Sequence, residues 1–250
     1  MKKKVRVAFF DFTCCEGCQI ELTNLGEPVF LGLCNHIDFV EFREVMKEQT
    51  TEPIDISFIE GSFSRESDRS RLEDIRRRSG VVIAYGSCAA IAGINALKNH
   101  LGDYREAVYG ADADMPHLDS QAARPISAVI KVDYSILGCP IDKNEFYHVV
   151  SDLLHGKEPF IPDYPVCVEC KMRETVCRYH SGDHCLGLVA RAGCDAPCPA
   201  RGVPCEACRG MVSHPNKETL TKVLMEKGGL SAERADHKTR LWAQMFREDN

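Results

Sequence analysis

Residues 167–208 read CVECKMRETVCRYHSGDHCLGLVARAGCDAPCPARGVPCEAC, and they contain eight of the fourteen cysteines of this chain. The spacing is C-x2-C-x6-C-x7-C, followed by C-x3-C-x6-C-x2-C. Glycines and prolines recur between the cysteines and break both helix and strand periodicity. We therefore expect metal-thiolate bonds to order much of this segment, as they do in small metal-binding domains.

Thiolates at this density form disulfides, zinc sites or iron-sulfur clusters. Disulfides need an oxidising compartment. Structural zinc sites typically use two C-x2-C pairs, and each half of this row has only one. Iron-sulfur clusters take four cysteines that can come from more widely spaced positions. The row predicts two four-cysteine clusters, and a zinc-stabilised interaction module is the alternative.

Composition limits the classes of function. Hydrophobic residues make up 44% and charged residues 27% of the 250 residues, which is typical of a globular protein. The net charge of -6 argues against nucleic acid as the main partner. No apolar run approaches the roughly 18 residues of a membrane-spanning helix. We therefore expect neither nucleic-acid binding nor a direct membrane span.

The N-terminus predicts a strand. The apolar run at residues 5–12 follows three lysines, but it contains Arg6 and Asp11 and is too short for the core of a secretion signal. Many cysteines without such a signal indicate reduced thiols, so we expect a cytoplasmic location.

Apolar patterning predicts an α/β fold. We expect strands at residues 5–12, 39–45, 54–59, 81–85 and 126–132 and helices at residues 19–33, 64–78, 86–97 and 142–154, with Ser64 as an N-cap. This alternation predicts a doubly wound parallel sheet. Residues 102–124 lack periodicity and are interpreted as a long loop. After Cys208 we expect two helices, the second carrying Leu241, Trp242, Met245 and Phe246, that pack on the cysteine-rich segment or on a partner.

Three further cysteine loops follow predicted strands. They contain Cys14, Cys15 and Cys18, then Cys88, then Cys139. The carboxyl ends of parallel strands meet at one edge of a sheet, where ligands bind. Cys15, Cys18, Cys88 and Cys139 thus predict a third set of four. Cys34 is interpreted as a buried free thiol, whereas Cys14 is either free or a competitor of Cys15.

Other cofactor motifs are absent from the sequence. It has no P-loop and no G-x-G-x-x-G fingerprint. Cysteines occupy the first loop, where a flavin phosphate would require serine, threonine or glycine. We therefore expect no flavin and no bond-making site on this chain.

Four motifs resemble those of the small, electron-transfer subunit of nickel-iron hydrogenases, a fold shared with a cluster-bearing subunit of respiratory complex I. They are Thr13-Cys14-Cys15-Glu16-Gly17-Cys18, Ile59-Glu60-Gly61-Ser62, Gly86-Ser87-Cys88-Ala89-Ala90 and Gly138-Cys139-Pro140. The resemblance covers about residues 5–210. It implies a flavodoxin-like domain at residues 1–160, a two-cluster iron-sulfur domain at 161–213 and a helical tail at 214–250.

The resemblance also implies the cofactor ligands. Cys15, Cys18, Cys88 and Cys139 would hold a proximal cluster, Cys167, Cys170, Cys177 and Cys185 a distal cluster, and Cys194, Cys198, Cys205 and Cys208 a medial cluster. Many relatives have a histidine at the position of Cys167 and a proline near Cys198. Because both positions are cysteines here, three 4Fe-4S clusters are expected, as in cytoplasmic hydrogenases.

The implied partners are a nickel-iron hydrogenase large subunit, which carries the catalytic site, and an electron-accepting flavin or iron-sulfur subunit. The alternative is a cluster-bearing subunit of a complex I-like oxidoreductase. It leaves eight cysteines without a use, because such subunits usually hold one cluster on this fold. Glu60 aligns near a position where some relatives have an aspartate ligand. Because Cys139 is present, we interpret Glu60 as a neighbour of the cluster or a proton relay.

Overall fold

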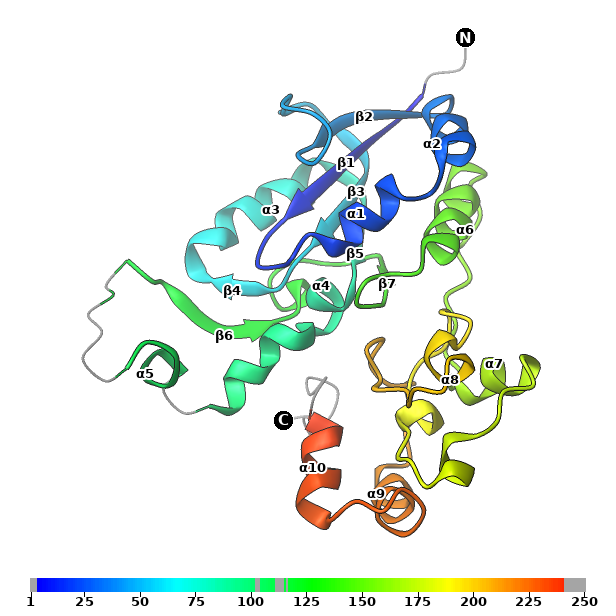
Figure 1. Ribbon diagram of the computed structural model, residues 1–250. Helices are drawn as coiled ribbons and strands as arrows, with labels where there is room; N and C mark the ends of the chain where they lie inside the picture. The colour runs from blue at the N-terminus through cyan, green and yellow to red at the C-terminus, as the bar shows by residue number, and fades with distance from the viewer. Residues whose placement is uncertain (1–3, 102–103, 111–114, 116, 241–250) are drawn as a thin grey trace.

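A five-stranded parallel sheet forms the centre of the N-terminal part of the molecule (Figure 1). The computed structural model describes residues 4–101, 104–110, 115 and 117–240. The strands are β1 (Val5–Asp11), β2 (Ile37–Phe42), β3 (Ile54–Glu60), β5 (Ser79–Tyr85) and β7 (Tyr134–Ile136). Their order, β2-β1-β3-β5-β7, is that of flavodoxin-like sheets. The predicted α/β fold class is therefore confirmed.

Alternation along the strands builds a core on each face of the sheet. In β1, Val7 and Phe9 enter one apolar cluster, whereas Ala8 and Phe10 enter the other. The helices that cover the sheet are α1 (Gly17–Thr23), α2 (Glu27–Cys34), α3 (Arg69–Arg78), α4 (Ser87–Ile91) and α6 (Lys143–Leu154). Residues of α1, α2 and α6 join the first cluster, and residues of α3 and α4 join the second. Both faces are thus covered, as a parallel sheet requires.

Phe9 lies at the centre of the first cluster and supports a prediction about stability. Its ring stacks on Phe42 at 4.6 Å and on Phe58 at 4.7 Å between centroids. Replacing Phe9 with alanine should lower the free energy of unfolding by about 3–5 kcal/mol, because the cavity cannot collapse fully. Denaturant unfolding of the complete chain, followed by circular dichroism, measures the change. Leu31→Ala, at a side chain that is 53% exposed, is the control, and an equal loss there would contradict the prediction.

Two expectations about the first helices are wrong. The helix predicted at residues 19–33 is two helices, because the chain turns between Thr23 and Glu27, where Gly26 has a φ of 87°. Ser64 is not an N-cap. It lies in β4 (Phe63–Arg65), and its hydroxyl bonds with that of Ser62 at 2.9 Å, while α3 begins five residues later. The other predicted helix that begins near Asp142 agrees, since the Asp142 side chain caps α6.

The region from residue 86 to residue 132 is more structured than its pattern indicates. The described residues form α4, a 3-10 helix (Gly93–His100), α5 (Tyr104–Tyr109) and β6 (Ser120–Arg124), which pairs with β4. The strand predicted at residues 126–132 is wrong. Ile126 and Ile130 are both buried four residues apart, and Ile130 N–H donates to the Ile126 carbonyl. This spacing suits a helical turn, and the last strand of the sheet is β7 instead.

The C-terminal part contains short helices and a helical pair (Figure 1). They are α7 (Cys167–Met172), α8 (Pro197–Ala200), α9 (Lys217–Glu226) and α10 (Ala232–Arg240). Leu220 and Leu224 of α9 share one apolar cluster with Val166 and Leu186. Lys238 Nζ also donates to both carboxylate oxygens of Glu206, at 2.7 Å each. The tail therefore packs on the cysteine-rich segment of its own chain. Leu241, Trp242, Met245 and Phe246 lie outside the described residues.

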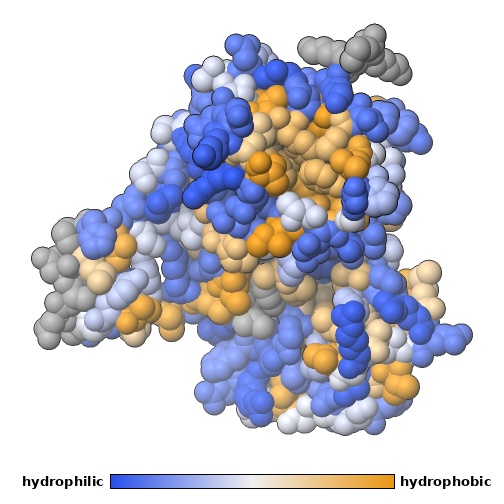
Figure 2. All heavy atoms as spheres, turned by 45° about the horizontal axis from the view of Figure 1, so that its top comes forward, coloured by the Kyte–Doolittle hydropathy of each residue, from blue (hydrophilic) through white to orange (hydrophobic). Residues whose placement is uncertain are grey.

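The surface is mainly hydrophilic, with apolar residues gathered over part of the sheet domain (Figure 2). Large exposed apolar side chains include Leu31 of α2, Tyr147 of α6 and Met172 of α7. Within the described part of the chain, we find no helix with the length and hydrophobicity needed to cross a membrane.

Candidate metal centres

The first set of cysteines gathers at the carboxyl edge of the sheet. Cys15 and Cys18 follow β1, Cys88 follows β5 and Cys139 follows β7. Burial raises the pKa of the Cys88 thiol to about 12, and the charges of Cys139 and Cys15 contribute to this shift. Burial and then Glu60 raise the pKa of Cys18, with further contributions from Cys88 and Cys139. Electrostatic coupling of this kind requires short distances, so the fold brings together the four cysteines that the sequence grouped.

Glu60 fixes Cys18 at the end of β3. Its carboxylate is 2% exposed and accepts hydrogen bonds from the N–H groups of Cys18 and Gln19, both at 3.2 Å. The Tyr85 hydroxyl donates to the Cys18 carbonyl at 2.9 Å. Burial raises the pKa of Glu60, whereas the two backbone bonds lower it. Because both oxygens are engaged by the backbone, the geometry favours Glu60 as a residue that positions Cys18.

The two remaining cysteines of the N-terminal part differ in position. The Cys14 thiol donates to the Phe12 carbonyl at 3.6 Å, within its own loop. Cys34 ends α2 and is partly exposed rather than buried, so that expectation is wrong. Its carbonyl accepts a bond from Lys4, just before β1, which places it at the opposite edge of the sheet from Cys15. Cys34 therefore lies too far along the strands to join the first set.

The second set is Cys167, Cys170, Cys177 and Cys185. Burial raises the pKa of Cys167 to about 11, and the other three thiolates add to the shift. Cys167 and Cys170 lie on α7, whereas Cys177 and Cys185 each precede a 3-10 turn. The structure therefore brings together the four cysteines of the first half of the row.

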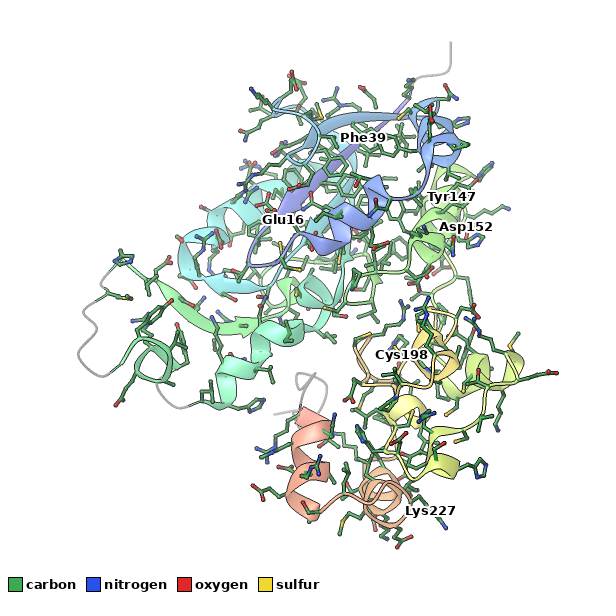
Figure 3. All side chains as sticks on the ribbon, viewed as in Figure 1. Glu16, Phe39, Tyr147, Asp152, Cys198 and Lys227 are labelled. Atoms are coloured by element: carbon green, nitrogen blue, oxygen red, sulfur yellow. The ribbon has the colours of Figure 1, made fainter. Side chains whose placement is uncertain are left out.

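The third set is Cys194, Cys198, Cys205 and Cys208. All four line a cavity of about 370 Å³, together with Cys139. Burial raises the pKa of Cys194 to about 12. Cys198 begins the short helix α8 next to Pro197, and Figure 3 shows it in the cysteine-rich part, while Glu16 lies beside the sheet. The four thiols thus share one partly enclosed space.

The third set lies between the other two. The Cys205 N–H donates to Cys185 Sγ at 3.3 Å, which joins the third set to the second. The backbone N–H of Cys139 lowers the pKa that burial raises at Cys208, which joins the third set to the first. Ser87 supports the same junction, because it accepts from Gly138 N–H at 3.0 Å and donates to the Cys208 carbonyl. Three groups of thiols therefore follow one another through the molecule.

The donor arrangement fits clusters better than single ions. Within residues 4–101, 104–110, 115 and 117–240, no three histidine, cysteine, aspartate or glutamate side chains are grouped closely enough to hold one metal ion. Zinc would need four sulfurs about 2.3 Å from one atom. A cubane cluster is held by four separated cysteines. Each set therefore suits a 4Fe-4S cluster, although the ligand roles of individual cysteines stay a prediction.

Sequence reasoning missed three polar residues near these sites. Ser87 bonds across the junction between the first and third sets, and Arg209 and Glu145 form a buried ion pair at 2.6 Å beside it. A signal was available for Arg209, since it directly follows a predicted ligand. No pattern in the sequence marks Glu145, which lies on a helix whose apolar face explains its fold.

The fold and the cysteine sets define a redox protein, and comparisons with known proteins identify its family. Residues 15–153 match the family model of the NADH ubiquinone oxidoreductase 20 Kd subunit. The sulfhydrogenase 2 subunit delta of Pyrococcus furiosus is 33% identical over 223 residues, which cover 89% of this chain and 93% of that protein. A subunit of the F420-non-reducing hydrogenase vhu of Methanocaldococcus jannaschii is 34% identical over 240 residues, or 82% of each protein.

A solved structure of an NAD+-reducing NiFe-hydrogenase in the H2-reduced state is also similar. It has a TM-score of 0.57 and 26% identity, covering 64% of this chain and 96% of that chain. The chain therefore belongs to the family of the complex I 20 kDa subunit and hydrogenase small subunits. Members of this family bind iron-sulfur clusters. This chain is a subunit of a hydrogenase, an oxidoreductase complex whose catalytic site lies on a partner subunit.

Proposed function

We propose that this chain carries electrons through three 4Fe-4S clusters between a nickel-iron site on the large subunit and an electron-accepting flavin or iron-sulfur subunit in the cytoplasm. The observation that carries the proposal is the order of the three cysteine sets, with the third between the other two. Splitting H2 releases two electrons, and clusters accept one electron at a time. A row of clusters is therefore the device that such a reaction needs.

The cysteines of this chain would hold and tune the clusters. When bound, 4Fe-4S clusters supply reversible one-electron transfer at potentials from about -700 to +450 mV. Four thiolates per cluster and nearby backbone N–H groups set where in this range each cluster lies. The Cys205 N–H beside Cys185 is one such group. The first set, at the edge of the sheet, would face the large subunit.

A complex I-like subunit with one cluster is the weaker candidate. The match to the 20 Kd subunit family covers residues 15–153 and ends before Cys167. One cluster would leave two further four-cysteine sets without a purpose. The relatives that extend through this region are hydrogenase subunits, including the subunit delta that covers 89% of this chain. These observations favour the relay with three clusters.

Metal analysis of the complete chain, purified anaerobically with its large subunit, tests the proposal. We expect about twelve iron atoms and twelve labile sulfides per chain, four for each cube, and a brown absorbance that bleaches on reduction. About four irons would indicate the one-cluster alternative. Zinc in place of iron would indicate a structural module and would contradict the proposal.

A further inference from the structure

Arg209 is the largest fully buried side chain in the described part of the molecule and is 2% exposed. Its guanidinium donates to the Ala192 carbonyl at 2.8 Å, to the Glu145 carboxylate at 2.6 Å and to the Leu137 carbonyl. Burying a charge is costly unless it is paired and hydrogen-bonded. The fold therefore maintains a positive charge here through three elements that are far apart in sequence.

The position of this charge is specific. Arg209 follows Cys208, Ala192 lies two residues before Cys194, and Leu137 lies two residues before Cys139. The guanidinium thus joins the loop of the first cysteine set to two loops of the third.

Gly193 provides the space for the ion pair. Its φ is 109°, and a Cβ atom there would lie 2.7 Å from Glu145 Oε1 and closer still to Arg209 Nη2. Any larger residue would collide with the pair. The backbone next to Cys194 is therefore shaped around the ion pair as well as around the cysteine.

The surrounding charges are unevenly placed. Arg209 acts against burial to lower the pKa of both Cys194 and Cys208, which shows that its charge stabilises negative charge on those sulfurs. Glu169 opposes it from another direction, because its carboxylate accepts from Gly193 N–H at 2.7 Å and raises the pKa of Cys194. Glu145 pairs with Arg209 through Oε1, while Oε2 is buried without a hydrogen-bond partner among the described residues.

We propose that Arg209, held in place by Glu145, raises the reduction potential of the cluster on Cys194, Cys198, Cys205 and Cys208. The inference rests on the proposed function. A cluster gains one negative charge when it takes an electron from the neighbouring cluster on the first set, which is oxidised in turn. A fixed positive charge in a low-dielectric interior stabilises the reduced state. Arginine suits this role because its guanidinium stays protonated.

Two charge-removing variants should move the potential in opposite directions. Arg209→Gln should lower it, and Glu145→Gln should raise it, because the remaining Arg209 charge loses its counter-ion. We expect at least a tenfold change in the reduction equilibrium for Arg209→Gln, which is about 59 mV for a one-electron step. The measurement is a redox titration followed by electron paramagnetic resonance, on the complex with the large subunit. Iron content is determined in parallel.

Arg76→Gln is the matched control. Arg76 also pairs with an acidic residue, Asp133, at 2.6 Å and donates to backbone carbonyls, but it lies at the start of β5, away from the cysteine loops. Its replacement should leave all potentials unchanged.

The outcomes separate charge from structure. Opposite shifts in the two variants support the inference, as does a potential near that of the wild type in Arg209→Lys. Shifts in the same direction, or unchanged potentials at full iron content, overturn it. If Arg209→Gln loses iron, Glu145→Gln decides, because an upward shift supports the inference and no shift overturns it. A wild-type chain without iron would instead overturn the proposed function.

Discussion

Replacing Cys88 with alanine is expected to remove about four of twelve irons per chain and to abolish hydrogen-linked electron flow. Cys88 is coupled to Cys139 and Cys15 at the edge of the sheet, and a cubane needs all four thiolates. Residues that merely support metal ligands already cost about 10–100-fold in metal affinity or activity when replaced. A lost ligand at the entry to the relay should cost more. Iron analysis and hydrogen-dependent dye reduction by the complex measure both effects.

Cys34→Ala is the matched control for this prediction. It removes a thiol of the same domain that lies at the opposite edge of the sheet. Its iron content and electron flow should equal those of the wild type. Loss of four irons in this variant would show that the assignment of the first set is wrong.

Gly86→Ala should also destroy the first cluster, although it removes no ligand. Gly86 has a φ of 85°, and a Cβ atom there would lie 2.5 Å from Cys18 Sγ. Cys18 cannot move away easily, because Glu60 binds its N–H and Tyr85 binds its carbonyl. We therefore expect loss of about four irons per chain, as for the ligand variant. The readouts are iron content and the resonance signal of the reduced complex.

Gly26→Ala separates this steric effect from backbone strain. Gly26 has a φ of 87°, but nothing lies within 4 Å of the position that a Cβ atom would take there. Both alanines should cost about 1–2 kcal/mol of stability for a left-handed conformation. Only Gly86→Ala should lose iron, and equal iron in the two variants would contradict the prediction.

The junction at Ser87 and Cys208 gives the arrangement a physical sense. Ser87 neighbours Cys88 of the first set, and it bonds to the Cys208 carbonyl of the third set. The rate of electron transfer depends on the separation of the centres, so a direct bond between their supporting loops keeps that separation fixed. The buried pair of Arg209 and Glu145 reinforces the same junction.

Much of the fold could be predicted from the sequence, because it depends on local patterns. Alternating apolar residues in β1, and cysteines directly after three strands, were sufficient to predict a doubly wound sheet with a site at its carboxyl edge. Local patterns were misleading where tertiary packing decided the outcome. The pair Ile126 and Ile130 formed a buried turn rather than a strand, and Cys34 was only partly buried because it ends its helix.

The sequence by itself determined which cysteines belong to each set, since their spacing and their positions after strands are readable along the chain. Only the tertiary structure decided that the set containing Cys194 lies between the other two, because this order runs against the order of the sequence. It alone also joined Arg209 to Glu145 across 64 residues. A buried charge is stable only where its partners meet in space, and no one-dimensional pattern records that meeting.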